Sequence, residues 1–123
     1  CGITAVPPMP EIHKTALGAE DSVAWTHYAS AIDAVQDLRC KGYKILAVEQ
    51  VHGSTSLEQF VVDPCAKYAV VLGNEVKGVS QEVVDASDVC LEIPQCGTKH
   101  SLNIANTAAI VMWQMFSKMR LGC

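Results

Sequence analysis

Apolar residues along this chain alternate between strand-like runs and helix-like spacing. The run Tyr68–Leu72 is apolar without interruption, which predicts a strand covered on both faces, as in a parallel sheet. Tyr43–Val48 is predicted as another strand, and the apolar residues between and after these runs recur at helical spacing. The pattern predicts an α/β fold with a mainly parallel sheet and helices on both faces.

Turn and capping residues delimit the remaining predicted elements. The final helix is apolar on several faces, so we expect it to be buried in the core or against a second subunit, and we predict a homodimer. Further strands are predicted at Ile3–Val6, Val23–Tyr28 and Val89–Ile93. Helices are predicted weakly at Glu11–Leu17, after Ser30 until Gly42, after Ser80, and from a cap at Ser101 through Phe116.

Length and composition limit the kind of protein this is. With 123 residues, 50% of them hydrophobic, the chain is predicted to form one domain over residues 1–123. Its apolar runs are too short to span a membrane and its start lacks a secretory signal, so we expect a soluble protein without a membrane partner. A net charge of −4 argues against a general nucleic-acid-coating protein but allows an RNA enzyme with a local basic patch.

The six cysteines do not have the spacing of a metal site. No CxxC pair is present and no histidine pair stands near the cysteines at ligand spacing, so no metal is expected. Reduced, mostly buried thiols are favoured over disulfides, since cysteine packs as a small hydrophobic residue. Reduced thiols favour a cytoplasmic setting. Arg39 is expected to be a solvated residue of its helix.

Two polar loops directly follow predicted strands. Gly73-Asn74-Glu75 follows Leu72, and loop 94–100 with Ser101 and Asn103 follows the predicted strand Val89–Ile93. The polar residues 49–56 after Val48 can equally line a site or form a plain solvated loop. Taken singly, each loop can equally be a plain turn, and Ser101 and Asn103 can be plain helix caps. Two such loops after buried strands favour a ligand site. The glycine spacing is neither a dinucleotide fingerprint nor a P-loop, and hydrolase and metalloprotease motifs are missing.

Two segments resemble motifs of a known enzyme family. LGNEVKGVS (72–80) and IPQCGTKHSLNIA (93–105) are similar to the second and third motifs of the SpoU, or TrmH, family within the SPOUT methyltransferases. KTALGAE (14–20) and AVEQ (47–50) fit more weakly, and the resemblance covers essentially the whole chain. It implies transfer of methyl from S-adenosylmethionine to a ribose 2′-hydroxyl of tRNA or rRNA, with S-adenosylhomocysteine as product. It also implies a deep C-terminal trefoil knot and a homodimer.

The resemblance also implies which residues form the site. Three loops would make a cup for the cofactor, using mainly backbone groups. The cofactor-binding residues would be Val48, Glu49, Leu72, Gly73, Asn74, Glu75, Ile93, Gln95, Ser101, Leu102 and Asn103. The polar side chains nearest the reacting centre, and so the catalytic candidates, would be Glu75, Ser101 and Asn103. RNA would be contacted by Lys77, Lys99 and His100.

The first family motif is not present in this sequence. Its Asn and Arg would lie upstream of Cys1, and the Arg is the residue usually assigned to activating the hydroxyl. We therefore expect a methyltransferase domain truncated at its N-terminus, which binds the cofactor with poor or no catalysis by itself. The alternative is a catalytically silent, knotted dimeric module that binds RNA or a protein partner. A Rossmann-type oxidoreductase is disfavoured because its glycine fingerprint is missing.

Overall fold

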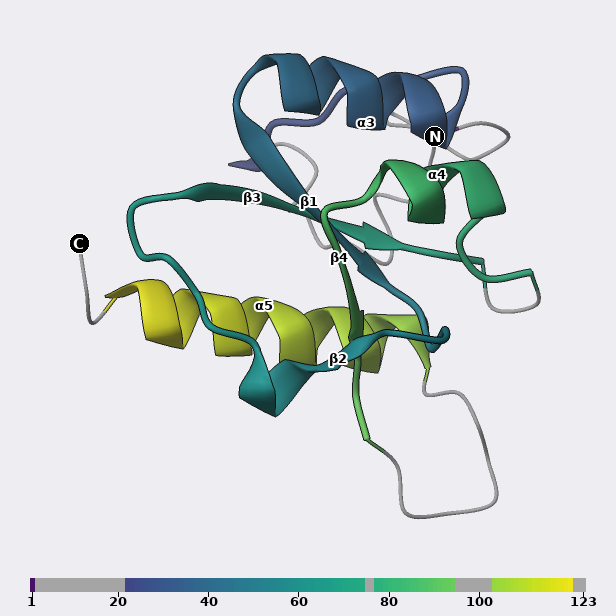
Figure 1. Ribbon diagram of the computed structural model, residues 1–123. Helices are drawn as coiled ribbons and strands as arrows, with labels where there is room; N and C mark the ends of the chain where they lie inside the picture. Colours follow the sequence, from purple (N-terminus) through teal and green to yellow (C-terminus); the bar gives the residue numbers. More distant parts are fainter. Residues whose placement is uncertain (2–21, 75–76, 95–102, 121–123) are drawn as a thin grey trace. The chain divides into compact units, whose positions relative to one another are not determined.

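The computed structural model describes Cys1 and residues 22–74, 77–94 and 103–120 (Figure 1). Two compact units make up the chain, Cys1–Ala34 and Val35–Cys123. The prediction of a single domain stays a prediction. Among the helices of the described residues, none combines the length and the apolar character that crossing a bilayer requires.

The described part of the first unit contains no strand at the predicted position. Residues 23–28 are irregular, and the side chains of Val23 and Trp25 are 64% and 50% exposed. The prediction of a strand at Val23–Tyr28 is wrong, because alternating apolar residues form a strand only where a neighbouring strand and a buried face are available. The predicted elements Ile3–Val6 and Glu11–Leu17 lie outside the described residues.

The second unit contains a four-stranded sheet in the order β2-β4-β1-β3, in which all neighbouring strands are parallel. The central strand β1 pairs with β3 along its whole length and with β4 on its other side. The strands are β1 (Tyr43–Val48), β2 (Thr55–Ser56), β3 (Lys67–Leu72) and β4 (Val89–Glu92). The predicted parallel sheet is confirmed.

Helices cover both faces of this sheet, as predicted. α5 lies on one face, and α4 lies on the other with the part of α3 that belongs to the second unit (Figure 1). Ser30 caps α3, since its hydroxyl accepts the Asp33 N–H at 3.4 Å. Gly42, with φ of 88°, follows its end. The helices are α3 (Ala31–Cys40), α4 (Gln81–Ala86), α5 (Ile104–Arg120) and the 3-10 helix η1 (Leu57–Gln59).

Side-chain alternation along β1 divides the core between the two faces. Leu46 belongs to a buried cluster with Leu91 of β4 and with Val111 and Met115 of α5. Ile45 points to the opposite face and is fully buried, as are Val35 of α3 and Val83 of α4. A central strand that is apolar on both sides therefore holds the two helix layers on the sheet.

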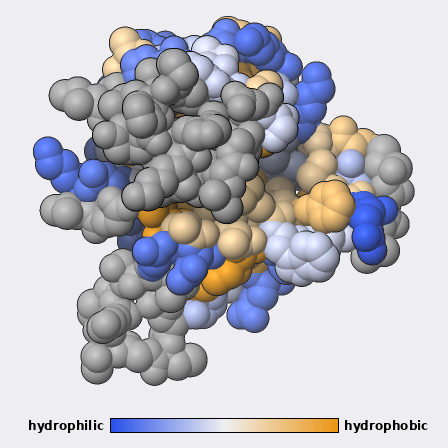
Figure 2. Space-filling view, turned by 180° about the vertical axis from the view of Figure 1, so that it is seen from behind, coloured by the Kyte–Doolittle hydropathy of each residue, from blue (hydrophilic) through white to orange (hydrophobic). Residues whose placement is uncertain are grey.

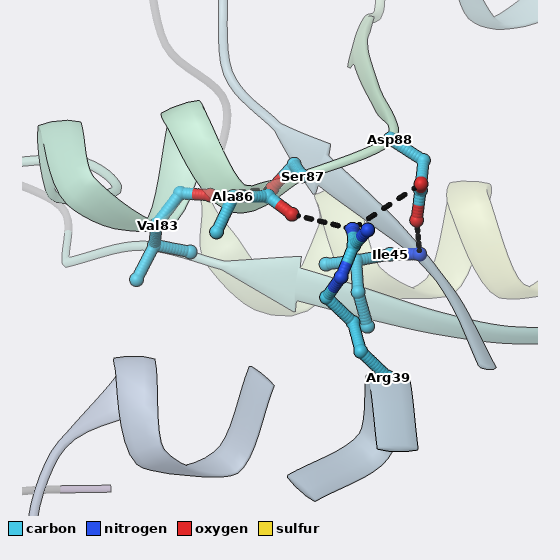
Figure 3. Close-up of polar contacts among 6 residues, drawn as sticks. All are labelled: Arg39, Ile45, Val83, Ala86, Ser87 and Asp88. Atoms are coloured by element: carbon cyan, nitrogen blue, oxygen red, sulfur yellow. Dashed lines mark hydrogen bonds and ion pairs between the residues drawn. The ribbon is translucent and has the colours of Figure 1, made fainter. Parts of the chain in front are cut away.

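A polar clamp joins α3, α4 and the start of β4 (Figure 3). Arg39 Nη1 donates to the Ala86 carbonyl at 2.7 Å and lies 3.2 Å from Asp88 Oδ1. Asp88 Oδ2 accepts the Ile45 N–H at 2.7 Å. The prediction that Arg39 is only a solvated residue is thus wrong: its side chain is 46% exposed, yet it connects three elements.

The segment after β1 contains structure where the sequence predicts only a polar loop. Thr55 and Ser56 pair with Leu91 and Glu92, and η1 follows directly. Leu57 is 6% exposed and belongs to the core cluster. A two-residue strand is too short to show periodicity. The apolar Leu57, directly after it, is the one local signal that could have indicated it.

The cysteines differ from the predicted reduced and mostly buried set. Cys65 is exposed and disulfide-bonded. Among the described residues, Cys1 and Cys40 are free and exposed, and Cys90 is free and half-buried. The prediction is wrong for Cys65 because spacing along the sequence does not indicate which thiols meet in space.

Candidate functional site

The parallel strands bring the predicted loops to one edge of the sheet. Val48 pairs with Leu72 on one side and with Leu91 on the other, so β1, β3 and β4 end side by side. Glu49, Gly73 and Ile93 follow these strand ends. The structure therefore brings together the described parts of all three predicted loops at the carboxyl edge, where open α/β sheets bind ligands.

The loop after β3 is closed at its base by its own backbone. The Asn74 carbonyl accepts the Gly78 N–H at 2.8 Å, and the two residues form an isolated bridge. Asn74 Oδ1 also accepts the Lys77 N–H at 3.2 Å. Gly78 has φ of 68°, a conformation that favours glycine. The predicted turn is thus a tight loop whose two ends are held together by hydrogen bonds.

Gly73 allows this loop to fold back closely on the strand end. A Cβ added at Gly73 would collide with the Gly78 carbonyl carbon and the Val79 nitrogen, and would lie 2.6 Å from the Gly78 oxygen. These are backbone atoms and cannot swing aside as a flexible side chain would. Close backbone approach is therefore the reason for glycine at this position.

Glu49 connects the ends of all three strands. Its N–H donates to the Leu91 carbonyl at 3.0 Å, which extends the pairing of β1 with β4. Its carboxylate Oε2 accepts the Val79 N–H at 2.7 Å. A Cβ at Gly78 would collide with the same carboxylate. Nothing in the sequence shows that Glu49 is the partner of this loop or that Val79 is the donor.

Asn103 is the cap of α5. Its Oδ1 accepts the Ala105 N–H at 2.8 Å and the Asn106 N–H at 3.4 Å, and its carbonyl accepts the Thr107 N–H at 2.9 Å. The sequence offers Ser101 and Asn103 as caps; the helix begins at Ile104 and Asn103 caps it, while Ser101 lies outside the described residues. The short Asn side chain satisfies helix N–H groups just as Ser would.

The other predicted residues are placed as follows. Val48, Leu72 and Ile93 are half-buried at the strand ends, and Lys77 is exposed. The predicted residues outside the described ranges are Glu75, Gln95, Lys99, His100, Ser101 and Leu102.

Negative charge and burial affect the one described thiol near this edge. Burial raises the pKa of Cys90, and the carboxylates of Glu49 and Asp85 raise it further. The thiol therefore stays protonated at neutral pH and is a poor nucleophile there.

A separate hollow of about 540 Å³ is lined by residues of α4, the start of β4 and the segment before β2. His52, Asp85 and Cys90 are among its lining residues. Asp85 accepts a hydrogen bond from Gln81 at 2.8 Å. Within the part of the chain that the structure describes, none of the predicted cofactor residues lines this hollow.

The sheet, its covering helices and the glycine loop at the strand ends define an α/β protein whose loops gather at the carboxyl edge, where open α/β sheets bind ligands. Residues 3–113 match the model of the SpoU rRNA Methylase family, and the chain belongs to this family. The resemblance that the two motifs indicate is confirmed.

Similar proteins of known name include two tRNA methyltransferases. The chain is 35% identical over 89 residues to the tRNA (guanosine(18)-2'-O)-methyltransferase TARBP1 of Mus musculus, covering 72% of this chain and 6% of that protein. It is 33% identical over 104 residues to the tRNA (guanosine(18)-2'-O)-methyltransferase of Borreliella burgdorferi, covering 85% of this chain and 47% of that protein. The chain thus spans less than half the length of either relative.

Solved structures confirm the fold class. The SpoU methyltransferase AviRb from Streptomyces viridochromogenes, in complex with AdoMet, superposes with a TM-score of 0.81 at 24% identity, covering 98% of this chain and 49% of that one. The AdoMet-bound rRNA methyltransferase from Sinorhizobium meliloti superposes with a TM-score of 0.83 at 23% identity, covering 94% of this chain and 43% of that one. The trefoil knot stays a prediction, because residues 95–102 lie outside the described ranges.

Proposed function

We propose that the chain is the methyl-donor-binding domain of an S-adenosylmethionine-dependent RNA methyltransferase that acts on a ribose 2′-hydroxyl of tRNA or rRNA. The observation that carries this proposal is the junction of three strand ends through Glu49 and the Gly73–Gly78 loop, at the positions of the family's motifs. Membership of the SpoU family supports it, as do the names of the mouse and Borreliella relatives. The AdoMet-bound structural neighbours support the choice of methyl donor.

The described residues suit an adenosine ligand. Val48, Leu72 and Ile93 provide half-buried apolar surface at the strand ends, on which a purine can pack. The backbone at Gly73 and Asn74 provides polar groups for the ribose. We propose that these residues bind the donor together with Asn103 and with Glu75, Gln95, Ser101 and Leu102, which lie outside the described ranges. Glu49 borders the same site at the end of β1, with its carboxylate on the Val79 N–H.

Methyl transfer requires alignment of the acceptor oxygen and removal of its proton. When bound, S-adenosylmethionine supplies an electrophilic methyl group. We propose Glu75, Ser101 and Asn103 as the polar side chains nearest the reacting atoms. Oδ1 of Asn103 accepts bonds from its own helix, which leaves the Nδ2 group as the part of this side chain that can donate to a ligand. Lys77, Lys99 and His100 are proposed to contact RNA phosphates.

We also propose that α5 pairs with α5 of a second copy. Hydrophobic side chains gather on the face that α5 occupies in the rear view (Figure 2). The exposed fractions are 42% for Ile110, 59% for Met112, 64% for Trp113 and 54% for Phe116. Such a patch on one helix is typical of a protein interface. A cytoplasmic setting also stays a prediction, and the disulfide at Cys65 removes the cysteine argument for it.

Methyl transfer from labelled S-adenosylmethionine to bulk tRNA and to rRNA tests the function. The chain is assayed by itself and within any longer polypeptide that contains it, and the modified nucleosides are identified by mass spectrometry. The expected product is a 2′-O-methylated nucleoside. Donor binding without transfer in either form would favour the silent dimeric module, for which the exposed face of α5 is the supporting observation.

A further inference from the structure

One carboxylate holds the loop that the proposed donor site depends on. The peptide between Gly78 and Val79 has two close neighbours, the α-carbon of Gly73 and the carboxylate of Glu49, which accepts the Val79 N–H. Both glycines are needed for this arrangement, since a Cβ at Gly73 would collide with the peptide and a Cβ at Gly78 would collide with the carboxylate. We call this unit the Glu49 latch, made of Glu49, Gly73, Gly78 and Val79.

The latch links the three strand ends through a single residue. The backbone of Glu49 is paired to Leu91 at the end of β4, and its side chain reaches Val79 beyond the β3 loop. β1 lies between β4 and β3 in the sheet, so a residue that follows β1 can contact both neighbours. The bond from Val79 to Oε2 is 2.7 Å long and partly buried, and a bond to a charged acceptor is stronger than one between neutral groups.

We propose that Glu49 is a positioning residue for methyl-donor binding, whose carboxylate fixes the base of loop 73–78 instead of contacting the donor. This inference rests on the proposed function, because the loop is assigned there to the donor. Its consequence is that removing the acceptor at position 49 weakens donor binding through the loop. A neutral side chain that still accepts the Val79 N–H preserves binding.

The experiment compares Glu49→Ala, Glu49→Gln and Glu82→Ala in the whole chain. Glu82 is an exposed acidic residue in the first turn of α4, so its removal controls for the loss of one negative charge. Two quantities are measured for each variant: affinity for S-adenosylhomocysteine by calorimetry, and hydrogen exchange of the Val79 amide by NMR. Exchange reports on the latch whether or not the chain binds the ligand.

Glu49→Ala is expected to speed exchange at Val79 and to weaken S-adenosylhomocysteine binding about tenfold. Glu49→Gln and Glu82→Ala are expected to keep both quantities within about threefold of the unchanged chain, because Gln retains a carbonyl acceptor. Unchanged affinity in Glu49→Ala would overturn the inference. So would a tenfold loss in Glu49→Gln with Val79 still protected, since the carboxylate would then be a direct ligand. No binding by the unchanged chain would instead overturn the proposed function.

Discussion

Gly78 and Gly53 differ in what surrounds them, although both have positive φ. Gly53 has φ of 85° and open space where a Cβ would be placed. Gly78 has φ of 68°, and a Cβ there would collide with the Glu49 carboxylate. An alanine at Gly53 therefore costs only the free energy of a left-handed backbone. An alanine at Gly78 also pushes against the Glu49 carboxylate.

We expect Gly78→Ala to lower the free energy of unfolding by about 1–3 kcal/mol, and by more than Gly53→Ala. Both variants adopt a left-handed backbone that disfavours alanine, so their difference measures the steric contact with Glu49. Urea unfolding followed by circular dichroism gives both values. Equal losses would mean that the carboxylate moves aside without cost.

Cys90 provides an independent measure of the charge on Glu49. Because burial, Glu49 and Asp85 raise the pKa of this thiol, it should react with iodoacetamide more slowly than the exposed Cys40 at pH 8. Glu49→Gln should speed the reaction at Cys90, since losing a nearby negative charge lowers the thiol pKa. Mass spectrometry of the alkylated peptides follows both sites. An unchanged rate at Cys90 in this variant would contradict the charge effect.

The same thiol makes stability depend on alkaline pH. A folded pKa above the ordinary value of 9.0 favours the folded state fully below pH 9.0. That contribution is lost as the pH rises from 9.0 through the raised value, because the unfolded chain ionises first. Cys90→Ser would flatten this part of the stability profile.

At the residue scale, the sequence predicts which residues belong to the site better than it predicts which of them form hydrogen bonds with each other. Glu49, Gly73 and Asn74 are placed at one site by their positions after apolar strands, and the structure does bring them to one edge. The bond from Val79 to Glu49 joins residues 30 positions apart. A carboxylate after a buried strand has several possible partners, and only the packing of the loop decides among them.

At the element scale, Asn103 caps α5 and is also proposed to bind the methyl donor, and one substitution series separates the two roles. Asn103→Ala should lower the free energy of unfolding by about 1 kcal/mol, because two helix N–H groups lose their acceptor. Asn103→Asp should retain the cap and stability. If the Asn103 amide also donates to the methyl donor, Asn103→Asp should still weaken S-adenosylhomocysteine binding in calorimetry. Full binding by Asn103→Asp would restrict the residue to capping.

Element prediction succeeds where the apolar signal is long. β1 is found at its predicted bounds, and β3 begins one residue earlier than predicted, because both strands carry long apolar runs. β1 is buried in its middle, whereas β3, at the edge of the sheet, is half-buried. The sequence misses β2, whose two residues carry no period, and wrongly predicts a strand at Val23–Tyr28, where both apolar side chains are exposed. Whether each segment forms a strand depends on a neighbouring strand to pair with, and the local sequence does not show that neighbour.

At the scale of the whole molecule, the outer face of α5 predicts self-association. Trp113→Glu should convert a dimer to a monomer, because a charge would then face the apolar patch of the second copy. Val61→Glu, at a side chain that is 87% exposed and outside α5, is the matched control and should leave the mass unchanged. Light scattering after gel filtration measures the mass. A monomeric unchanged chain would contradict the proposed interface.

The central claim is that the carboxyl ends of β1, β3 and β4 bind the methyl donor. Amide chemical shifts of the ¹⁵N-labelled chain, recorded during titration with S-adenosylhomocysteine, test it most directly. We predict saturable shifts at Glu49, Gly73, Asn74 and Val79. No shifts at millimolar ligand, or shifts confined to the hollow lined by His52 and Asp85, would contradict the claim.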